Sequence, residues 1–201
     1  LVSPDRFPAV RAVLAKERHA SPYMEKYVLE SLFLMGDAAA ALARMELRYR
    51  DIVAGPLTTL PELFGKGGTD NHAWSGGPLT LLSQYVVGVA PTAAGFATFT
   101  VRPQLGGLTR AHAGFDTVKG RIEAAVSKEG GVFRLKLQVP EGTVATMCVP
   151  VAEHGLKAVR AQGGGVWPGV TPAVPGLKAV EGPAGHASFK VQPGVWEFEA
   201  R

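Results

Sequence analysis

The chain has 201 residues, of which 46% are hydrophobic and 19% charged, an ordinary globular composition that suffices for one large domain or two small ones. The formal net charge is +4, but the basic residues form no run, which argues against a nucleic-acid partner. No apolar stretch reaches the roughly 18 residues that a membrane-spanning helix needs, and the first residues do not resemble a signal peptide.

Helical periodicity governs the sequence up to about residue 90. Ser21 is expected to cap a helix that starts at Pro22. Gly36 is expected to end that helix, and Asp37 to cap the next one. A further helix is expected to open at Pro78. The predicted helices cover residues 10–18, 23–35, 38–50 and 79–87.

The helix at 23–35 is apolar over more than a narrow stripe, so we expect it to be well buried. The residues expected on its apolar face are Met24, Tyr27, Val28, Leu32 and Met35.

Period-two alternation replaces the helical pattern in the second part of the chain. In residues 131–140, for example, Leu135, Leu137 and Val139 face one way. Short runs of this kind, separated by Gly and Pro, predict an antiparallel β-sandwich, so the expected fold class is α+β in two parts. The strand-like runs are residues 96–103, 117–127, 131–140, 143–151 and 186–200, whereas residues 163–183 are expected to form a long surface loop with room for one irregular strand.

The single cysteine, Cys148, excludes an intrachain disulfide. It lies in one of these strand-like runs, which favours a buried, inert thiol over a nucleophile. The histidines show no metal-ligand spacing, and we expect neither a metal nor a cofactor.

The most informative segment is TTLPELFGKGGTDNHAWSGGPLTLLSQY, residues 58–85. Long loops in compact domains are usually functional or disordered, and the aromatic residues here argue against disorder. Carboxylate, amide and imidazole groups bind sugar hydroxyls, an aromatic ring stacks on a pyranose, and a carboxylate can serve as a catalytic acid or base. The residues of these types are Glu62, Asp70, Asn71, His72 and Trp74.

Three segments carry a specific resemblance: SPYMEKYVLESLFLMGD (residues 21–37), TTLPELFG (58–65) and GGTDNHAWSGGPLTLLSQYVVGVAPTAAGFATFTVRPQLGGL (67–108). In this order and spacing they resemble the α-L-rhamnosidases of glycoside hydrolase family 78, and the resemblance covers at least residues 20–125.

The resemblance implies an (α/α)6 catalytic barrel followed by a C-terminal β-sandwich. Residues 1–92 would then supply the last helices of the barrel, and residues 93–201 would form the sandwich. It also implies an inverting hydrolase whose substrate is a rhamnoside or a related carbohydrate. The general acid of the family precedes the segment matched here, so we expect the missing N-terminal part of the same enzyme to be a partner and the isolated chain to be inactive.

The resemblance assigns Glu62 as the catalytic general base and His72 as a residue that lines the sugar subsite. Trp74, beside His72, is expected to stack on the sugar, and Phe64 is a further substrate-binding candidate. Phe64 and Pro61 stand where the family commonly has Trp, which bears on substrate identity.

Each candidate also has a structural alternative. Glu62 would be a solvated loop carboxylate, His72 a hydrogen-bonded structural residue, Trp74 a packing residue and Asp70 a turn or cap residue. Tyr23, Glu25 and Tyr27 are interpreted as core residues, with the barrel mouth as the alternative.

Two further functions stay open for the chain as a whole. One is a non-catalytic sugar-binding or scaffold module, and the other is an (α/α)6 glycosidase for a different sugar. An intact four-helix unit packed on a sandwich is the alternative to a partial barrel.

Overall fold

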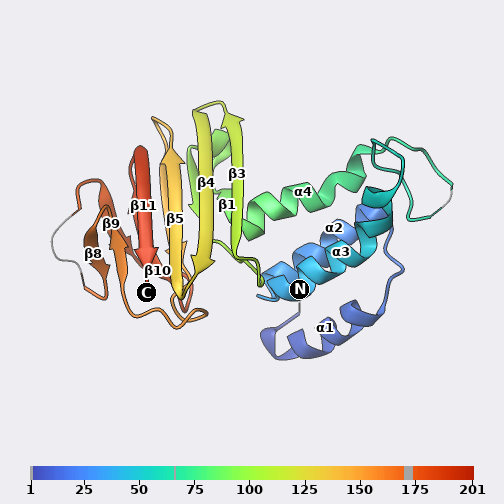
Figure 1. The fold of residues 1–201 in the computed structure, drawn as a ribbon, viewed down its shortest axis with the longest axis horizontal. Helices are drawn as coiled ribbons and strands as arrows, with labels where there is room; N and C mark the ends of the chain where they lie inside the picture. Colours follow the sequence, from blue (N-terminus) through green and yellow to red (C-terminus); the bar gives the residue numbers. More distant parts are fainter. Residues whose placement is uncertain (1, 66, 170–173) are drawn as a thin grey trace. The chain divides into compact units, whose positions relative to one another are not determined.

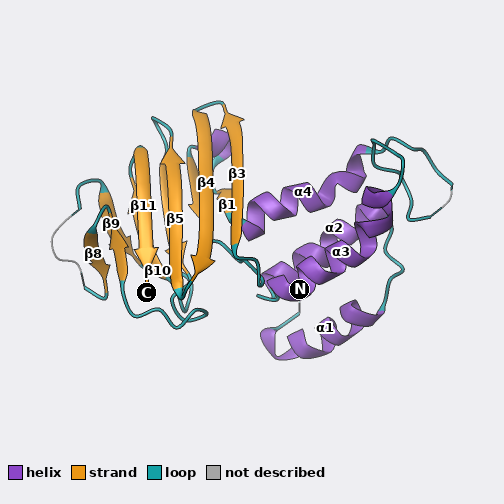
Figure 2. Ribbon diagram, in the orientation of Figure 1, coloured by secondary structure: helices purple, strands orange, loops and turns teal. Residues whose placement is uncertain are grey.

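The computed structural model describes residues 2–65, 67–169 and 174–201. The chain divides into two compact units, Leu1–Leu82 and Ser83–Arg201. The first unit is helical and the second is built from strands, as Figures 1 and 2 show. This confirms the α+β class. No helix of the described residues is long and apolar enough to cross a membrane.

The caps of α2 and α3 and the stop between them lie where the sequence indicates, whereas α1, the end of α3 and α4 differ from the predicted bounds by several residues. The Ser21 hydroxyl accepts a hydrogen bond from the N–H of Met24 at 3.4 Å, and Asp37 accepts one from Ala40 at 3.2 Å. Gly36 lies between the two helices with φ of +73°, a backbone conformation that favours glycine. The helices are α1 (Phe7–Lys16), α2 (Pro22–Leu34), α3 (Ala38–Ala54) and α4 (Gly77–Leu81), and short 3₁₀ turns occupy Pro4–Arg6 and Ala73–Gly76.

The buried face of α2 differs from the one expected. Met24 and Tyr27 are 48% and 42% exposed, and of the five predicted side chains only Leu32 is buried. The expectation was wrong because it counted apolar residues alone, whereas the helix turns Glu25 inward together with Leu29, Leu32 and Phe33. The core interpretation is therefore confirmed for Glu25 and wrong for Tyr27 and Tyr23, which is 40% exposed.

An ion pair explains the position of Glu25, whose side chain is fully buried. Arg44 of α3 donates to both carboxylate oxygens, from Nε to Oε1 and from Nη2 to Oε2 at 3.0 Å. Arg48 Nε lies 3.4 Å from Oε2. Arg44 also donates to the carbonyl oxygens of Leu14 and Glu17, so one guanidinium links α2 and α3 to the end of α1.

The second unit is a sandwich of two sheets. The five-stranded sheet has the order β1-β2-β6-β10-β9, and the six-stranded sheet has the order β3-β4-β5-β11-β7-β8. Pairing among the described strands is antiparallel except between β2 and β6, which run parallel. The strands are β1 (Val89–Pro91), β2 (Thr98–Val101), β3 (Arg110–Thr117), β4 (Gly120–Glu129), β5 (Val132–Val139), β6 (Val144–Val149), β7 (Val159–Ala161), β8 (Gly164–Trp167), β9 (Leu177–Val180), β10 (Ala187–Val191) and β11 (Gly194–Ala200).

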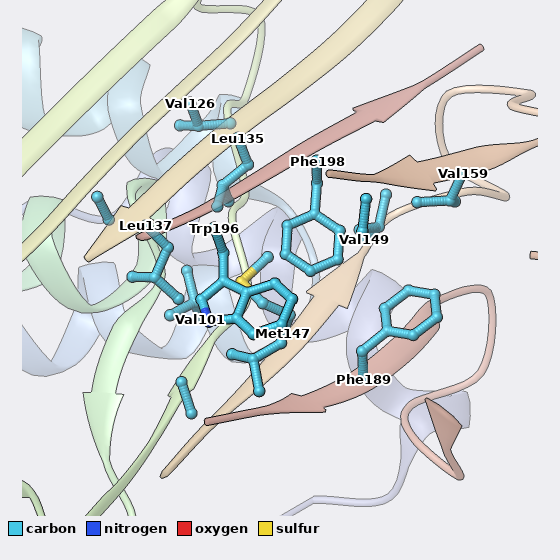
Figure 3. Packing of buried hydrophobic residues seen from close by; sticks show 14 of the residues in the cluster. Val101, Val126, Leu135, Leu137, Met147, Val149, Val159, Phe189, Trp196 and Phe198 are labelled. Atoms are coloured by element: carbon cyan, nitrogen blue, oxygen red, sulfur yellow. The ribbon is translucent and has the colours of Figure 1, made fainter. Parts of the chain in front are cut away.

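Alternation along the strands places the core between the sheets (Figure 3). Leu135, Leu137 and Val139 of β5 are buried on one face, as predicted. They pack in one cluster with Trp196 and Phe198 of β11. Burying a large apolar side chain contributes about 1.5–3 kcal/mol, so this cluster is the main stabilising feature of the unit.

Three details of the strand prediction need correction. The run at 117–127 contains the turn between β3 and β4, and β3 itself was missed because its Ala, His and Gly residues give only weak alternation. The stretch 163–183 holds two strands, β8 and β9, which are short and pair with one strand each, although residues 170–173 lie outside the described ranges. Strand β1 pairs with β2, so the sandwich begins before the boundary at residues 92 and 93 that the resemblance implied.

Cys148 matches its sequence expectation, and Gly88 meets a steric requirement of its position. Cys148 is 3% exposed, and burial raises the pKa of its thiol, which fits an inert side chain. Gly88, which follows the π-helical segment Leu82–Val86, has φ of +88°, and a Cβ there would stand 2.2 Å from the carbonyl carbon of Arg102. Only glycine fits that approach.

Candidate functional site

The loop between α3 and the 3₁₀ turn at Ala73–Gly76 closes on itself through backbone hydrogen bonds. The N–H of Glu62 donates to the Thr69 carbonyl at 2.8 Å, and the N–H of His72 donates to the Leu60 carbonyl at 2.8 Å. The buried hydroxyl of Ser75 donates to the Pro61 carbonyl at 2.6 Å, which ties the far end of the loop to the residue before Glu62. These bonds bring Glu62, Thr69 and His72 together.

The side chains of these residues form a hydrogen-bonded cluster. Oε2 of Glu62 accepts from the backbone N–H of Thr69 at 3.1 Å and from its hydroxyl at 3.4 Å. The same hydroxyl lies 2.7 Å from Nδ1 of His72, and Nδ1 is 3.8 Å from Oε2. Glu62 and His72 keep 28% and 29% of their side chains exposed, so the cluster is half-buried and reachable from solvent.

The Thr69 hydroxyl bridges the two side chains, and the tautomer of the imidazole sets which of Thr69 Oγ1 and His72 Nδ1 donates in their contact. Nε2 of His72 makes no hydrogen bond within the described residues and is open to a ligand hydroxyl. Oε1 of Glu62 makes no hydrogen bond within the described residues and can accept from a ligand or a water molecule.

Glycine is required next to the carboxylate. Gly68 has φ of +76°, and a Cβ at this position would stand 3.0 Å from both Cβ and Oε2 of Glu62. A larger residue would strain the backbone and press on the carboxylate. Gly68 therefore serves the position of Glu62 as well as the turn.

An aromatic strip, formed by His72, Trp74, Tyr23 and Tyr27, continues from the cluster. The ring centroids of His72 and Trp74 are 4.0 Å apart, with 34° between the ring planes. The ring centroid of Tyr23, a residue of α2, lies 5.1 Å from that of Trp74. Tyr27 follows at 5.6 Å from Tyr23, with the two hydroxyls 3.3 Å apart. Trp74 is 45% exposed, so its ring is fixed by neighbours and still available to a ligand.

Phe64 has a different environment from the other candidates. The Phe64 ring centroid is 5.2 Å from that of Tyr49, with an angle of 81° between the ring planes. The guanidinium carbon of Arg48 lies 4.0 Å from the Phe64 ring centroid. Both partners belong to α3. These contacts describe a residue that anchors the loop on the helix. The carbonyl of Asp70 accepts from the Thr59 hydroxyl, which fits the turn role expected for this residue.

Sequence reasoning missed Thr69, Ser75 and the participation of Tyr23 in the aromatic strip. A threonine between a candidate base and a histidine is a usable signal for a bridging hydroxyl, whereas Tyr23 lies too far along the chain for any local pattern to reveal it. No group of three or more His, Cys, Asp or Glu side chains that could hold a metal occurs in the described ranges.

Comparison with known proteins finds a family model for part of the second unit and solved structures of similar fold for most of the chain. Residues 88–164 match the family model of the bacterial α-L-rhamnosidase C-terminal domain. No curated protein sequence matches the chain. The structure of the α-L-rhamnosidase from Dictyoglumus thermophilum is similar over 88% of this chain and 20% of that chain, with a TM-score of 0.74 and 20% identity.

Two further solved structures have the same fold. The α-L-rhamnosidase of Streptomyces avermitilis, complexed with L-rhamnose, is 22% identical over 88% of this chain and 17% of that chain, with a TM-score of 0.66. The family 78 rhamnosidase of Bacillus sp. GL1 is 24% identical over 73% of this chain and 17% of that chain, with a TM-score of 0.62. The present chain thus spans a fifth or less of these relatives.

Proposed function

The chain resembles the C-terminal part of the α-L-rhamnosidases of glycoside hydrolase family 78, and we propose that it is that part of a longer, inverting hydrolase that removes terminal α-L-rhamnose from glycosides. The observation that carries the proposal is the carboxylate of Glu62, held by Thr69 beside His72 and continuous with an exposed aromatic strip.

In the proposed reaction, Glu62 is the general base. A water molecule donates a proton to Oε1, and its oxygen attacks the anomeric carbon from the face opposite the leaving group. The bond between the anomeric carbon and the glycosidic oxygen breaks, and a carboxylic acid from the preceding part of the protein protonates that oxygen. Inversion requires about 6.5–9.5 Å between the two carboxyl groups, which leaves room for the water.

The sugar would be held by the residues around Glu62. Nε2 of His72 would form a hydrogen bond with a sugar hydroxyl, which can donate or accept. The exposed rings of Trp74 and Tyr23 offer apolar faces for the C–H groups of a pyranose or of the attached aglycone. Phe64 supports the site by fixing the loop on α3.

In this proposal the helices of the first unit complete an (α/α)6 barrel with helices from the preceding part of the protein. Exposed large apolar side chains on three of these helices support this, because helices from the preceding part of the protein could cover them. The most exposed are Leu34 at 66%, Val53 at 80% and Leu79 at 74%.

Nitrophenyl glycosides of several sugars test the proposal on the longer protein and on the 201-residue chain. The longer protein should release nitrophenol from the α-L-rhamnoside and from none of the others at a comparable rate. The 201-residue chain should release none, since one carboxylate cannot supply both acid and base. A preference for another sugar would indicate a glycosidase of different specificity. Rhamnose binding without turnover in the longer protein would favour a binding module.

A further inference from the structure

A groove of about 960 Å³ lies on the outer face of the six-stranded sheet. The register of the strands places the main row of side chains in this groove across five neighbouring strands. Arg110 of β3 lies opposite Ser127 of β4, which lies opposite Arg134 of β5, followed by Glu199 of β11 and Arg160 of β7. Arg134, Glu199 and Arg160 point away from the core, because the residues before and after each of them are buried. Arg110 and Ser127 stand in register with them and therefore point to the same side.

Positive charge exceeds negative charge in the groove by three. The carboxylates are Glu197 and Glu199, and the cations are Arg110, Arg134, Lys136, Arg160 and Arg201. Glu199 is shared by two arginines, at 3.3 Å from Arg134 Nε and 2.9 Å from Arg201 Nη2. Lys136 lies 3.1 Å from Glu197. The acidic residues are therefore all engaged, and cationic groups are left over.

Two arginines at opposite ends of the row have no carboxylate partner. The side chain of Arg110 forms no hydrogen bond or ion pair with any residue that the structure describes. Arg160 donates to the Gly163 carbonyl from Nε at 3.1 Å and from Nη2 at 2.6 Å, but it forms no ion pair within the same ranges. A guanidinium is suited to bidentate binding of a carboxylate, which makes both residues candidate anchors for an anionic ligand.

Small residues give the groove its depth. Ala125, Ser127 and Gly163 separate the long cationic side chains, and the volume falls within the range of pockets that bind small ligands. The Ser127 hydroxyl, the exposed His112 ring and the Glu197 carboxylate add both donors and acceptors. A ligand that carries hydroxyl groups as well as negative charge would match this mixed lining.

We propose that this groove binds an oligosaccharide that carries carboxylate groups. A neutral saccharide would leave the surplus guanidinium groups unpaired. A nucleic acid would bring closely spaced phosphates against Glu197 and Glu199, and of the described lining residues only His112 offers an exposed ring on which a base could stack. The proposal concerns the sandwich alone and does not depend on the role of Glu62.

Calorimetric titration of the 201-residue chain with trigalacturonate tests the proposal, with a neutral trisaccharide and a sulfated disaccharide as comparisons. Trigalacturonate should bind more tightly than either, and its affinity should fall as salt is added. Arg110→Ala and Arg160→Ala should each weaken binding about tenfold or more, while Glu199→Gln should strengthen it because it removes a repulsive charge.

Arg121→Ala is the matched control. Arg121 is also exposed on the six-stranded sheet, but it lies outside the groove, 2.8 Å from Glu123 and 3.4 Å from Asp116. This variant should bind like the parent chain, and thermal unfolding should show that all variants are folded. Four results would each overturn the proposal: no binding of trigalacturonate at millimolar concentration, equal binding of the neutral trisaccharide, tighter binding of the sulfated one, or equal losses in Arg121→Ala and Arg110→Ala.

Discussion

Thr69 holds Glu62 by two donors at one oxygen, its backbone N–H at 3.1 Å and its hydroxyl at 3.4 Å from Oε2. The same hydroxyl is 2.7 Å from Nδ1 of His72. One residue therefore orients both the proposed base and the imidazole beside it. The second carboxylate oxygen stays free to face a water molecule.

Thr69→Val removes the hydroxyl and keeps the side-chain volume. We expect it to lower kcat of the longer enzyme by about tenfold or more with a smaller change in KM, since the hydroxyl orients both Glu62 and His72. Thr69→Ser keeps the hydroxyl and should restore most of the rate. Steady-state kinetics on an α-L-rhamnoside makes the comparison, and a Thr69→Val enzyme with the parent kcat would show that the bridge has no positioning role.

The aromatic strip predicts that two substitutions at Tyr23 have different effects on sugar binding. Tyr23→Ala removes a ring that lies 5.1 Å from Trp74 and should weaken rhamnoside binding about two- to tenfold. Tyr23→Phe keeps the ring and should bind like the parent. Inhibition constants for rhamnose in the longer enzyme measure both effects. If the alanine variant bound rhamnose as well as the phenylalanine variant, the strip would lie outside the sugar site.

The buried ion pair makes a prediction about stability. Glu25→Gln leaves Arg44 and Arg48 buried without a counter-charge, and we expect it to cost about 3–5 kcal/mol in the free energy of unfolding of the helical unit. Glu46→Gln is the control, because Glu46 forms an exposed pair with Arg50 and should cost at most about 1 kcal/mol. Urea unfolding gives both values, and equal losses would contradict this account of the pair.

His154 predicts how the sandwich responds to acid. Burial lowers the pKa of His154 below its ordinary value of 6.5, and the ammonium of Lys128 lies 2.9 Å from its Nδ1, which favours the neutral ring. Below pH 6.5 the unfolded chain gains a proton there that the folded chain does not, so stability should fall as the pH drops from 6.5 towards the folded pKa.

His154→Gln should weaken this dependence of the melting temperature on pH, and His112→Gln, at an exposed position of the same unit, should preserve it. Thermal melts between pH 5 and 8 provide the comparison. An unchanged acid response in the His154 variant would mean that another group controls it.

Local chemistry explains which parts of the fold could be predicted from the sequence. Ser21, Asp37 and Gly36 act on neighbours within a few residues, so their roles follow from the sequence alone. The inward face of α2 does not, because it is decided by Arg44, a residue on another helix. Strands β8 and β9 were missed for a similar reason, since their partners β7 and β10 define them more than their own alternation does.

The same distinction between local contacts and contacts with other elements applies to the candidate site. Glu62 and His72 lie within eleven residues of one another, and the closed loop brings them together through Thr69, which was not singled out from the sequence. Phe64 was grouped with them by sequence position, but its ring contacts are with α3. The contribution of Tyr23 depends on how α2 meets the turn that carries Trp74, which no local pattern encodes.

The most direct test of the central claim is the turnover of the longer enzyme with Glu62→Gln, measured on an α-L-rhamnoside alongside Asp70→Asn. Asp70 is an exposed carboxylate of the same loop, so its variant controls for the loss of a charge there. If Glu62 is the general base, its variant should lose at least about 10² in kcat while the Asp70 variant stays near the parent rate. A Glu62→Gln enzyme that turns over as fast as the parent would contradict the account.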